Sequence, residues 1–132
     1  MTHLFDTNAW LRLVETPDQV SGSVRGLIST LRGPCGLSAI SIWEVCFKVR
    51  KGLINFSVPL DDWLQLSLNP LYVQVIPLDA QIARLSTELP GEFHKDPADR
   101  FIVATARSRN LTIVTSDEKI LSYSHVQSLD TR

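Results

Sequence analysis

The chain has 132 residues, of which 44% are hydrophobic and 20% charged. This balance is typical of a globular protein and excludes a disordered or fibrous chain, so we expect one domain over residues 1–132. Thirteen basic residues against 14 acidic ones leave a net charge of −1. A nucleic-acid partner would therefore need positive charge that is concentrated locally.

The cellular location is predicted from three absences. The two cysteines, Cys35 and Cys46, have no metal-ligand spacing and cannot form a disulfide framework, which favours a reducing compartment. No apolar run approaches the roughly 18 residues of a membrane span. The first ten residues lack the basic segment of a signal peptide. We expect a cytoplasmic protein with no membrane partner.

The hydrophobic pattern alternates short strands with helices. In chain order it predicts a strand ending at 4–5, helices over 9–14 and 20–31, a strand over 37–40, helices over 41–52 and 61–68, a strand over 72–76, helices beginning after 79 and at 97, a strand over 112–115, a turn with a short helix over 116–120, and a strand over 126–129. Such alternation indicates a three-layer α/β/α fold with a central, mainly parallel sheet. Ligands of such sheets bind beyond the carboxyl ends of the strands.

Four acidic residues are predicted at that carboxyl edge. Asp6 follows the first strand, Asp117 lies two residues past the strand over 112–115, and Glu44 and Asp99 each lie in the first turn of a helix. Each acid has an ordinary alternative explanation. Asp6 and Asp99 could cap helices, Asp117 could belong to a turn, and Glu44 could close a capping box with Ser41 or pair with a lysine one turn later.

Four carboxylates at one edge would repel one another unless a cation lay between them. Mg²⁺ or Mn²⁺ suits such oxygen ligands, whereas the absence of histidine and cysteine ligands argues against zinc. None of His3, His94 and His125 is assigned to the metal, and His94 is expected at most to contact a substrate. The pattern thus predicts a divalent-cation site that can activate water and stabilise charge on a phosphoryl oxygen.

Four motifs resemble those of PIN-domain nucleases, and more closely the VapC-type toxins of bacterial toxin–antitoxin pairs. They are Asp6-Thr7-Asn8, Ser41-x-x-Glu44, Asp99-Arg100 followed by Ile102, Ala104 and Ala106, and Thr115-Ser116-Asp117. The segments over 41–52 and 94–100 are similar to that toxin subgroup in particular. The resemblance extends over about residues 2–129.

The resemblance implies a metal-dependent endoribonuclease. In such an enzyme one or two Mg²⁺ or Mn²⁺ ions are held by the four acids, and a metal-bound water attacks the phosphorus in line. The carried-over catalytic and metal-binding residues are Asp6, Glu44, Asp99 and Asp117, with Asn8, Thr115 and Ser116 in support and Asp96 as a possible accessory acid. A simple helix cap explains Asp96 equally well.

The resemblance also implies RNA, an antitoxin protein and a second copy of the chain as partners. Arg100, Lys48 and Lys95 are predicted to contact RNA, although each could be an ordinary exposed cation. Trp43 and Phe47 lie off the core stripe of their helix and are predicted to contact the antitoxin. Trp10, Leu11 and Trp63 either extend that apolar surface or join the core.

Other interpretations remain open at this point. A PIN fold that has lost activity could act as a binding module, and a DNA or flap nuclease would use the same acids. A receiver domain would need adjacent acids after its first strand, but Phe5 precedes Asp6. A haloacid-dehalogenase-like phosphatase would need a second acid where Asn8 stands.

Overall fold

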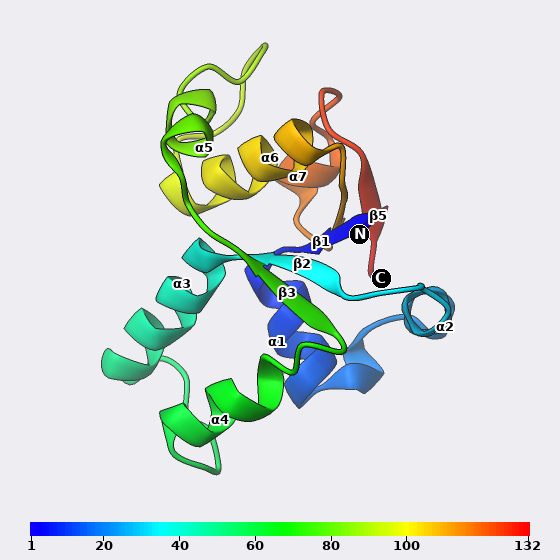
Figure 1. Cartoon of the computed structure of the whole chain (residues 1–132), viewed down its shortest axis with the longest axis vertical. Helices are drawn as coiled ribbons and strands as arrows, with labels where there is room; N and C mark the ends of the chain where they lie inside the picture. Colours follow the sequence, from blue (N-terminus) through cyan, green and yellow to red (C-terminus); the bar gives the residue numbers. More distant parts are fainter.

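The computed structural model describes residues 1–132 and contains five strands and seven α-helices (Figure 1). In chain order these are β1 (His3–Phe5), α1 (Thr7–Glu15), the 3₁₀ turn η1 (Pro17–Gln19), α2 (Gly22–Ser29), β2 (Cys35–Ser38), α3 (Ala39–Arg50), α4 (Leu60–Ser67), β3 (Val73–Ile76), α5 (Ala80–Leu85), α6 (Pro97–Arg109), β4 (Thr112–Thr115), α7 (Glu118–Leu121) and β5 (Ser128–Asp130). None of the helices combines the length and the apolar character that crossing a lipid bilayer requires.

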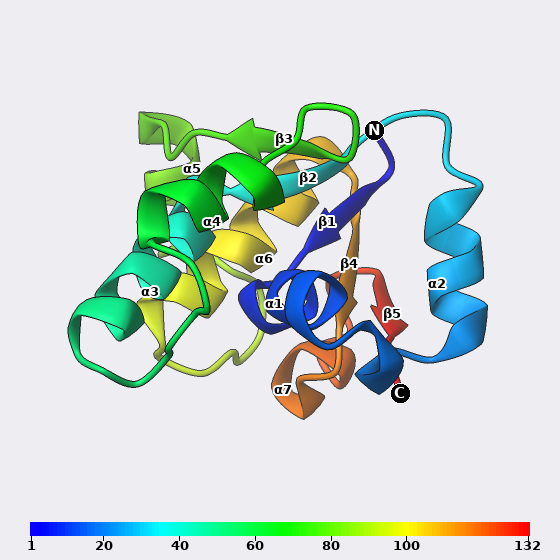
Figure 2. The same ribbon diagram turned by 90° about the horizontal axis from the view of Figure 1, so that it is seen from below.

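The five strands form one entirely parallel sheet in the order β3-β2-β1-β4-β5. Helices α5, α6 and α7 cover one face, and α1, α3 and α4 lie on the other (Figures 1 and 2). This arrangement confirms the predicted three-layer α/β/α fold. The order runs outward in both directions from β1, so β1 and β4 flank the point at which open parallel sheets usually bind ligands.

A separate apolar core fills each face of the sheet. Side chains alternate across a strand with a period of two, so Leu4 packs with α5–α7 while its neighbour Phe5 packs with α1–α4. In β4, Ile113 and Val114 divide in the same way. Trp10 and Trp63 meet edge to face in the second core, with ring centroids 5.0 Å apart, so both join the interior rather than the exposed surface.

Helix α6 crosses the first core, and its ends follow from its sequence. Asp96 caps the helix by accepting a hydrogen bond from Asp99 N, and Pro97 occupies the first helical position, as predicted. The helix ends at Asn110, whose φ of 54° is a left-handed conformation that asparagine adopts more readily than most residues. The apolar residues of α6 are buried, so the direction and depth of the helix fix the position of Asp99 in its first turn.

The structure corrects several predicted boundaries. Strand β2 spans Cys35–Ser38 rather than 37–40, and β5 spans Ser128–Asp130 rather than 126–129. Helix α3 begins at Ala39, two residues before Ser41, because Ser38 accepts a hydrogen bond from Ile40 N and caps the helix. The capping box predicted between Ser41 and Glu44 was therefore wrong, and Glu44 is free of any role in starting α3.

Candidate metal centre

The centre begins where β1 and β4 end side by side. Phe5 pairs with Val114 in the sheet, so the next residues, Asp6 and Thr115, lie opposite each other. The Thr115 hydroxyl donates to Asp6 Oδ2 and accepts a hydrogen bond from Asp117 N at 2.9 Å. One buried threonine thus links the two acids that follow the two strands, and its supporting role in a metal site stays a prediction.

Asp6 is buried at the start of α1, where it also caps the helix. Its Oδ1 accepts a hydrogen bond from Ala9 N at 2.7 Å. Burial raises the pKa of Asp6, while the bonds from Thr115 and Ala9 act in the opposite direction by stabilising the carboxylate. Both the capping role and the site role predicted for Asp6 are compatible with this geometry.

Glu44 projects from α3 toward the start of α1. The Thr7 hydroxyl donates to Glu44 Oε1 at 2.5 Å and lies 2.9 Å from the hydroxyl of Ser41, which is fully buried. Oε1 is therefore fixed by Thr7, and Oε2 has no hydrogen bond. Thr7, which also contacts Ser41, orients this carboxylate. An exposed surface charge would not need such support.

The carboxyl group of Asp99 has a strongly raised pKa. Burial and then the negative charges of Asp96, Asp117, Glu44 and Asp6 raise the pKa of Asp99 to about 7. The other three predicted acids therefore lie close enough to Asp99 to act on its carboxyl group at the carboxyl end of the sheet. No hydrogen-bond donor from the chain offsets this repulsion, in contrast to the two donors that Asp6 receives.

His94 lies at this centre although the sequence interpretation left it out of the metal site. Its Nε2 is 2.9 Å from Asp99 Oδ2, and donor atoms of His94, Asp99 and Asp117 all lie within 4.8 Å of one another. The only signal in the sequence was its place five residues before Asp99, in the segment that leads into α6. Periodicity gives no information about such a loop residue.

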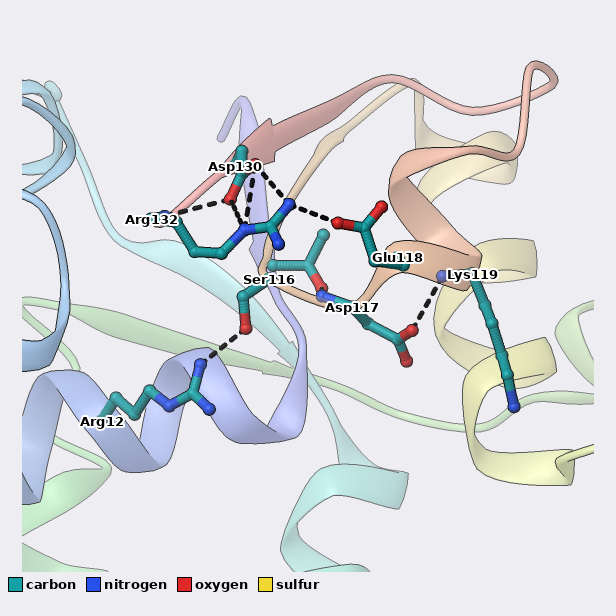
Figure 3. Close-up of polar contacts among 8 residues, drawn as sticks. Arg12, Ser116, Asp117, Glu118, Lys119, Asp130 and Arg132 are labelled. Atoms are coloured by element: carbon teal, nitrogen blue, oxygen red, sulfur yellow. Dashed lines mark hydrogen bonds and ion pairs between the residues drawn. The ribbon is translucent and has the colours of Figure 1, made fainter.

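The donor set fits a divalent cation. Four carboxylates offer hard, negatively charged oxygens, which Mg²⁺ and Mn²⁺ prefer. Burial and then repulsion from neighbouring acids raise the pKa of Asp99, and a bound cation would offset that repulsion. Asp117 caps the short helix α7 through Oδ1, which accepts from Lys119 N at 2.9 Å, and its second oxygen has no hydrogen bond (Figure 3). Asn8 is exposed in the first turn of α1, beside Asp6.

The predicted RNA-contacting cations have different positions. Arg100 donates to three backbone carbonyls, Ser86 O at 2.8 Å, Phe93 O at 3.0 Å and His94 O at 3.2 Å. These bonds give Arg100 a role within the fold, so its contact with RNA stays a prediction. Lys95 is exposed next to that loop, and Lys48 is half-buried in α3.

The loop from β4 to α7 is held from outside the centre as well. Arg12 reaches from α1 and donates to the Ser116 hydroxyl at 2.6 Å (Figure 3). On the other side Arg132 pairs with Glu118 at 2.6 Å and Asp130 at 2.9 Å, and all three side chains are exposed. Ser116 therefore supports the loop that carries Asp117 through its bond with Arg12.

Trp43 and Phe47 form an exposed aromatic pair on α3, as their position off the core stripe predicted. Their rings stack with centroids 5.0 Å apart, and 57% of Trp43 and 44% of Phe47 is exposed. The Lys51 ammonium lies 5.6 Å from the Phe47 centroid. A stacked pair this exposed is typical of a surface that contacts another protein.

Comparisons with known proteins agree with this geometry. The model of the PIN domain family matches residues 4–126. A curated relative named Ribonuclease VapC22, from Mycobacterium tuberculosis, is 32% identical over 89 residues, which cover 67% of each chain.

Solved structures show the same fold at lower identity. The DNA-bound VapBC structure from Salmonella typhimurium has a TM-score of 0.76 at 17% identity, covering 100% of this chain and 99% of that one. FitAcB from Neisseria gonorrhoeae has a TM-score of 0.72 at 23% identity, covering 98% of each chain. The family match and the curated relative establish that this chain belongs to the PIN-domain family, among its VapC-type members.

Proposed function

We propose that this protein is a metal-dependent endoribonuclease and the toxin of a toxin–antitoxin pair. The observation that carries the proposal is the gathering of four carboxylates at the carboxyl end of the sheet, where burial and the neighbouring negative charges raise the pKa of Asp99 to about 7. Helix capping alone would not require these charges to meet, and such strained acids are typical of functional sites. The ribonuclease named among the relatives supports RNA as the substrate.

Asp6, Glu44, Asp99 and Asp117 would hold one or two Mg²⁺ or Mn²⁺ ions. When bound, such a cation supplies Lewis acidity and lowers the pKa of a water molecule. The chain's own contribution is to hold the carboxylates in place before substrate arrives. Thr115 fixes Asp6, and Thr7 fixes Glu44 Oε1, so that Glu44 Oε2 is left to bind the cation or to take the proton of the attacking water.

Basic residues around the centre would bind the RNA backbone. Lys48 and Lys95 are the predicted contacts, and Arg12 brings a further positive charge beside Ser116. Because the net charge of the chain is −1, this local positive rim would supply the electrostatic part of RNA affinity. Reversing Lys48 and Lys95 together should lower both RNA affinity and its dependence on salt.

RNA cleavage by the purified protein, free of antitoxin, tests the enzymatic proposal. Total RNA would be incubated with Mg²⁺, with Mn²⁺ or with EDTA, in parallel for the wild type and Asp99→Asn. We expect discrete fragments that require the metal, and a loss of at least roughly 100-fold in the variant, because a ligand and its charge are removed. Asp18→Asn, at an exposed aspartate in η1, is the matched control and should cleave normally.

Two outcomes would contradict the proposal. Cleavage that persists in EDTA would exclude metal dependence. No cleavage under any metal by a protein whose circular dichroism shows it to be folded would favour a silent binding module. Single-stranded and flap DNA oligonucleotides in the same assay distinguish the DNA-nuclease alternative.

The proposed antitoxin would cover the aromatic pair on α3. Its support is the exposure of Trp43 and Phe47 together with the VapBC complexes among the structural neighbours. Trp43→Ala should weaken antitoxin binding roughly 100-fold, as expected for a central aromatic contact, and leave the melting temperature unchanged. Leu78→Ala, at another exposed apolar residue, is the control. An unchanged dissociation constant for Trp43→Ala would refute this surface.

A homodimer is proposed as the assembly of the free protein. Large apolar side chains remain exposed elsewhere on the surface, among them Leu66 and Leu71 at 73% each and Tyr72 at 68%. All three line one largely apolar pocket, and this is the surface that we expect a second copy to cover. Light scattering at micromolar concentration should give twice the mass of the chain, and a monomeric mass would refute the dimer.

A further inference from the structure

His94 Nε2 is the one buried side-chain nitrogen or oxygen in the molecule without a hydrogen-bond partner. It lies 2.9 Å from Asp99 Oδ2, but the geometry of this contact is not that of a hydrogen bond. A buried polar atom left without a partner destabilises the fold, so native proteins rarely retain one without a use. The position of this nitrogen therefore calls for a binding partner that the chain does not supply.

The segment around His94 is anchored by several contacts. Arg100 donates to the backbone carbonyls of Phe93 and of His94 itself. The Phe93 ring packs against the His94 ring at 4.5 Å and against Tyr123 at 4.9 Å, and the Tyr123 hydroxyl donates to Pro90 O. Arg100 thus holds the His94 backbone and Phe93 packs against its ring, so the approach of the imidazole to Asp99 is a property of the fold.

The spacing of the donor atoms matches the spacing of ligands around a cation. Two neighbouring ligands of an octahedral ion, with bonds of about 2.1 Å, lie roughly 3 Å apart. His94 Nε2 and Asp99 Oδ2 are 2.9 Å apart, and a donor oxygen of Asp117 lies within 4.8 Å of both. If Nε2 carries no proton, its lone pair and a carboxylate oxygen this close repel each other, and a cation between them removes that repulsion.

We propose that His94 Nε2 is a direct ligand of the divalent cation, beside Asp99 and Asp117. This inference rests on the proposed metal centre and extends it by a nitrogen donor. Imidazole binds first-row transition metal ions well, whereas Mg²⁺ prefers oxygen. His94 therefore makes the site selective for an ion such as Mn²⁺ over Mg²⁺, and Arg100 acts as the residue that positions it.

Pulsed electron paramagnetic resonance of Mn²⁺ bound to the full chain tests the ligand directly, without reference to cleavage. A nitrogen bonded to Mn²⁺ gives a strong modulation in the echo decay, and the modulation frequency changes when ¹⁴N is replaced by ¹⁵N. We expect this modulation in the wild-type protein and a change of frequency when the three histidines are labelled with ¹⁵N. This measurement needs no substitution and so does not depend on the folding of a variant.

Matched variants identify which histidine is responsible. His94→Gln should abolish the nitrogen modulation and weaken Mn²⁺ binding roughly tenfold, while Mg²⁺ binding changes much less. His125→Gln removes an exposed histidine of the same region and should change neither. Calorimetric titration with each ion measures the affinities, and thermal unfolding verifies that both variants are folded.

The outcomes separate this inference from the proposed function. Mn²⁺ that binds to the wild type and not to Asp99→Asn, but shows no nitrogen modulation, would overturn the role of His94 and leave the carboxylate centre intact. In that case His94 would be an ion-pair partner of Asp99. If Mn²⁺ fails to bind the wild-type protein at all, both the metal centre and the inference are refuted.

Discussion

Asp6 and Asp99 are two acids of one centre held in opposite ways. Asp6 is more deeply buried, yet it receives hydrogen bonds from Ala9 N and from Thr115, which partly offset the cost of burial. Asp99 receives none and faces four like charges, which together with burial raise its pKa to about 7. Strand β4 and the start of α1 thus supply the hydrogen bonds that Asp6 needs, whereas Asp99 is left dependent on something that binds.

The centre has two halves, Asp6 with Asp117 and Asp99 with His94, and different parts of the fold position them. Asp6 and Asp117 are placed by the ends of β1 and β4, which are fixed by the sheet register. Asp99 and His94 are placed by the start of α6 and by the segment before it, which Arg100 ties to the helix. Substitutions that act on one half and not on the other can therefore test this division.

The largest loss of stability is expected for Arg100→Met. The variant keeps the length of the side chain but loses three bonds to backbone carbonyls, and we expect the free energy of unfolding to fall by about 2–3 kcal/mol. Urea denaturation measures this loss. Arg84→Met, at an exposed arginine of α5, should change little. If Arg100→Met lowers the free energy of unfolding no more than Arg84→Met does, the bonds of Arg100 are not what positions Asp99 and His94.

Asp99→Asn should have the opposite effect on stability when metal is absent. The folded pKa of Asp99 lies near 7, above its value of about 4 in the unfolded chain, so rising pH ionises the unfolded state first and destabilises the fold. Wild type and variant should therefore be equally stable near pH 4, and the variant should be more stable by about 1–2 kcal/mol at pH 8. Denaturation in EDTA at both pH values checks the sign. A constant difference between them would show that Asp99 is not strained.

Thr115→Val tests the half of the centre that contains Asp6 and Asp117. Valine has nearly the same shape but neither donates to Asp6 nor accepts from Asp117 N, so the pKa of Asp6 should rise further and the fold should lose about 1 kcal/mol. Thr115→Ser keeps the hydroxyl and should retain most of the stability. The pKa can be followed by the ¹³C shift of the Asp6 carboxyl. Equal behaviour of the two variants would mean that the hydroxyl bond does not stabilise Asp6.

The first half of the centre, Asp6 and Asp117, could be predicted from the sequence because each acid lies within two residues of the end of a strand. That rule tolerates errors of one or two residues in strand boundaries, such as those at β2 and β5. The start of α6 was equally clear from Asp96-Pro97. Ser38 was missed as the cap of α3 because Ser41 offered the same signal, and the packing of Ser41 against Thr7 is a tertiary contact.

His94 could not be predicted because its position depends on long-range bonds that no local pattern encodes. The Arg100 side chain was expected at the RNA surface, and only the fold shows that its donors are engaged by the carbonyls that position His94. No histidine was assigned to the metal site from the sequence, because the motifs used there contain only acidic ligands. The structure places an imidazole beside Asp99, and the proposed cation preference follows from that difference.

The smallest effect is expected at the surface next to the centre. Arg132 pairs with Glu118 and Asp130 close to the loop that carries Asp117, and it lowers the pKa of Asp130 mainly by hydrogen bonding. All three side chains are exposed, so water and salt screen their attraction. Arg132→Gln should leave both the melting temperature and Mn²⁺ affinity within experimental error at physiological salt. A clear loss of Mn²⁺ affinity in this variant would mean that the position of Asp117 depends on these surface ion pairs. The loop after β4 would then position Asp117 as much as the sheet does.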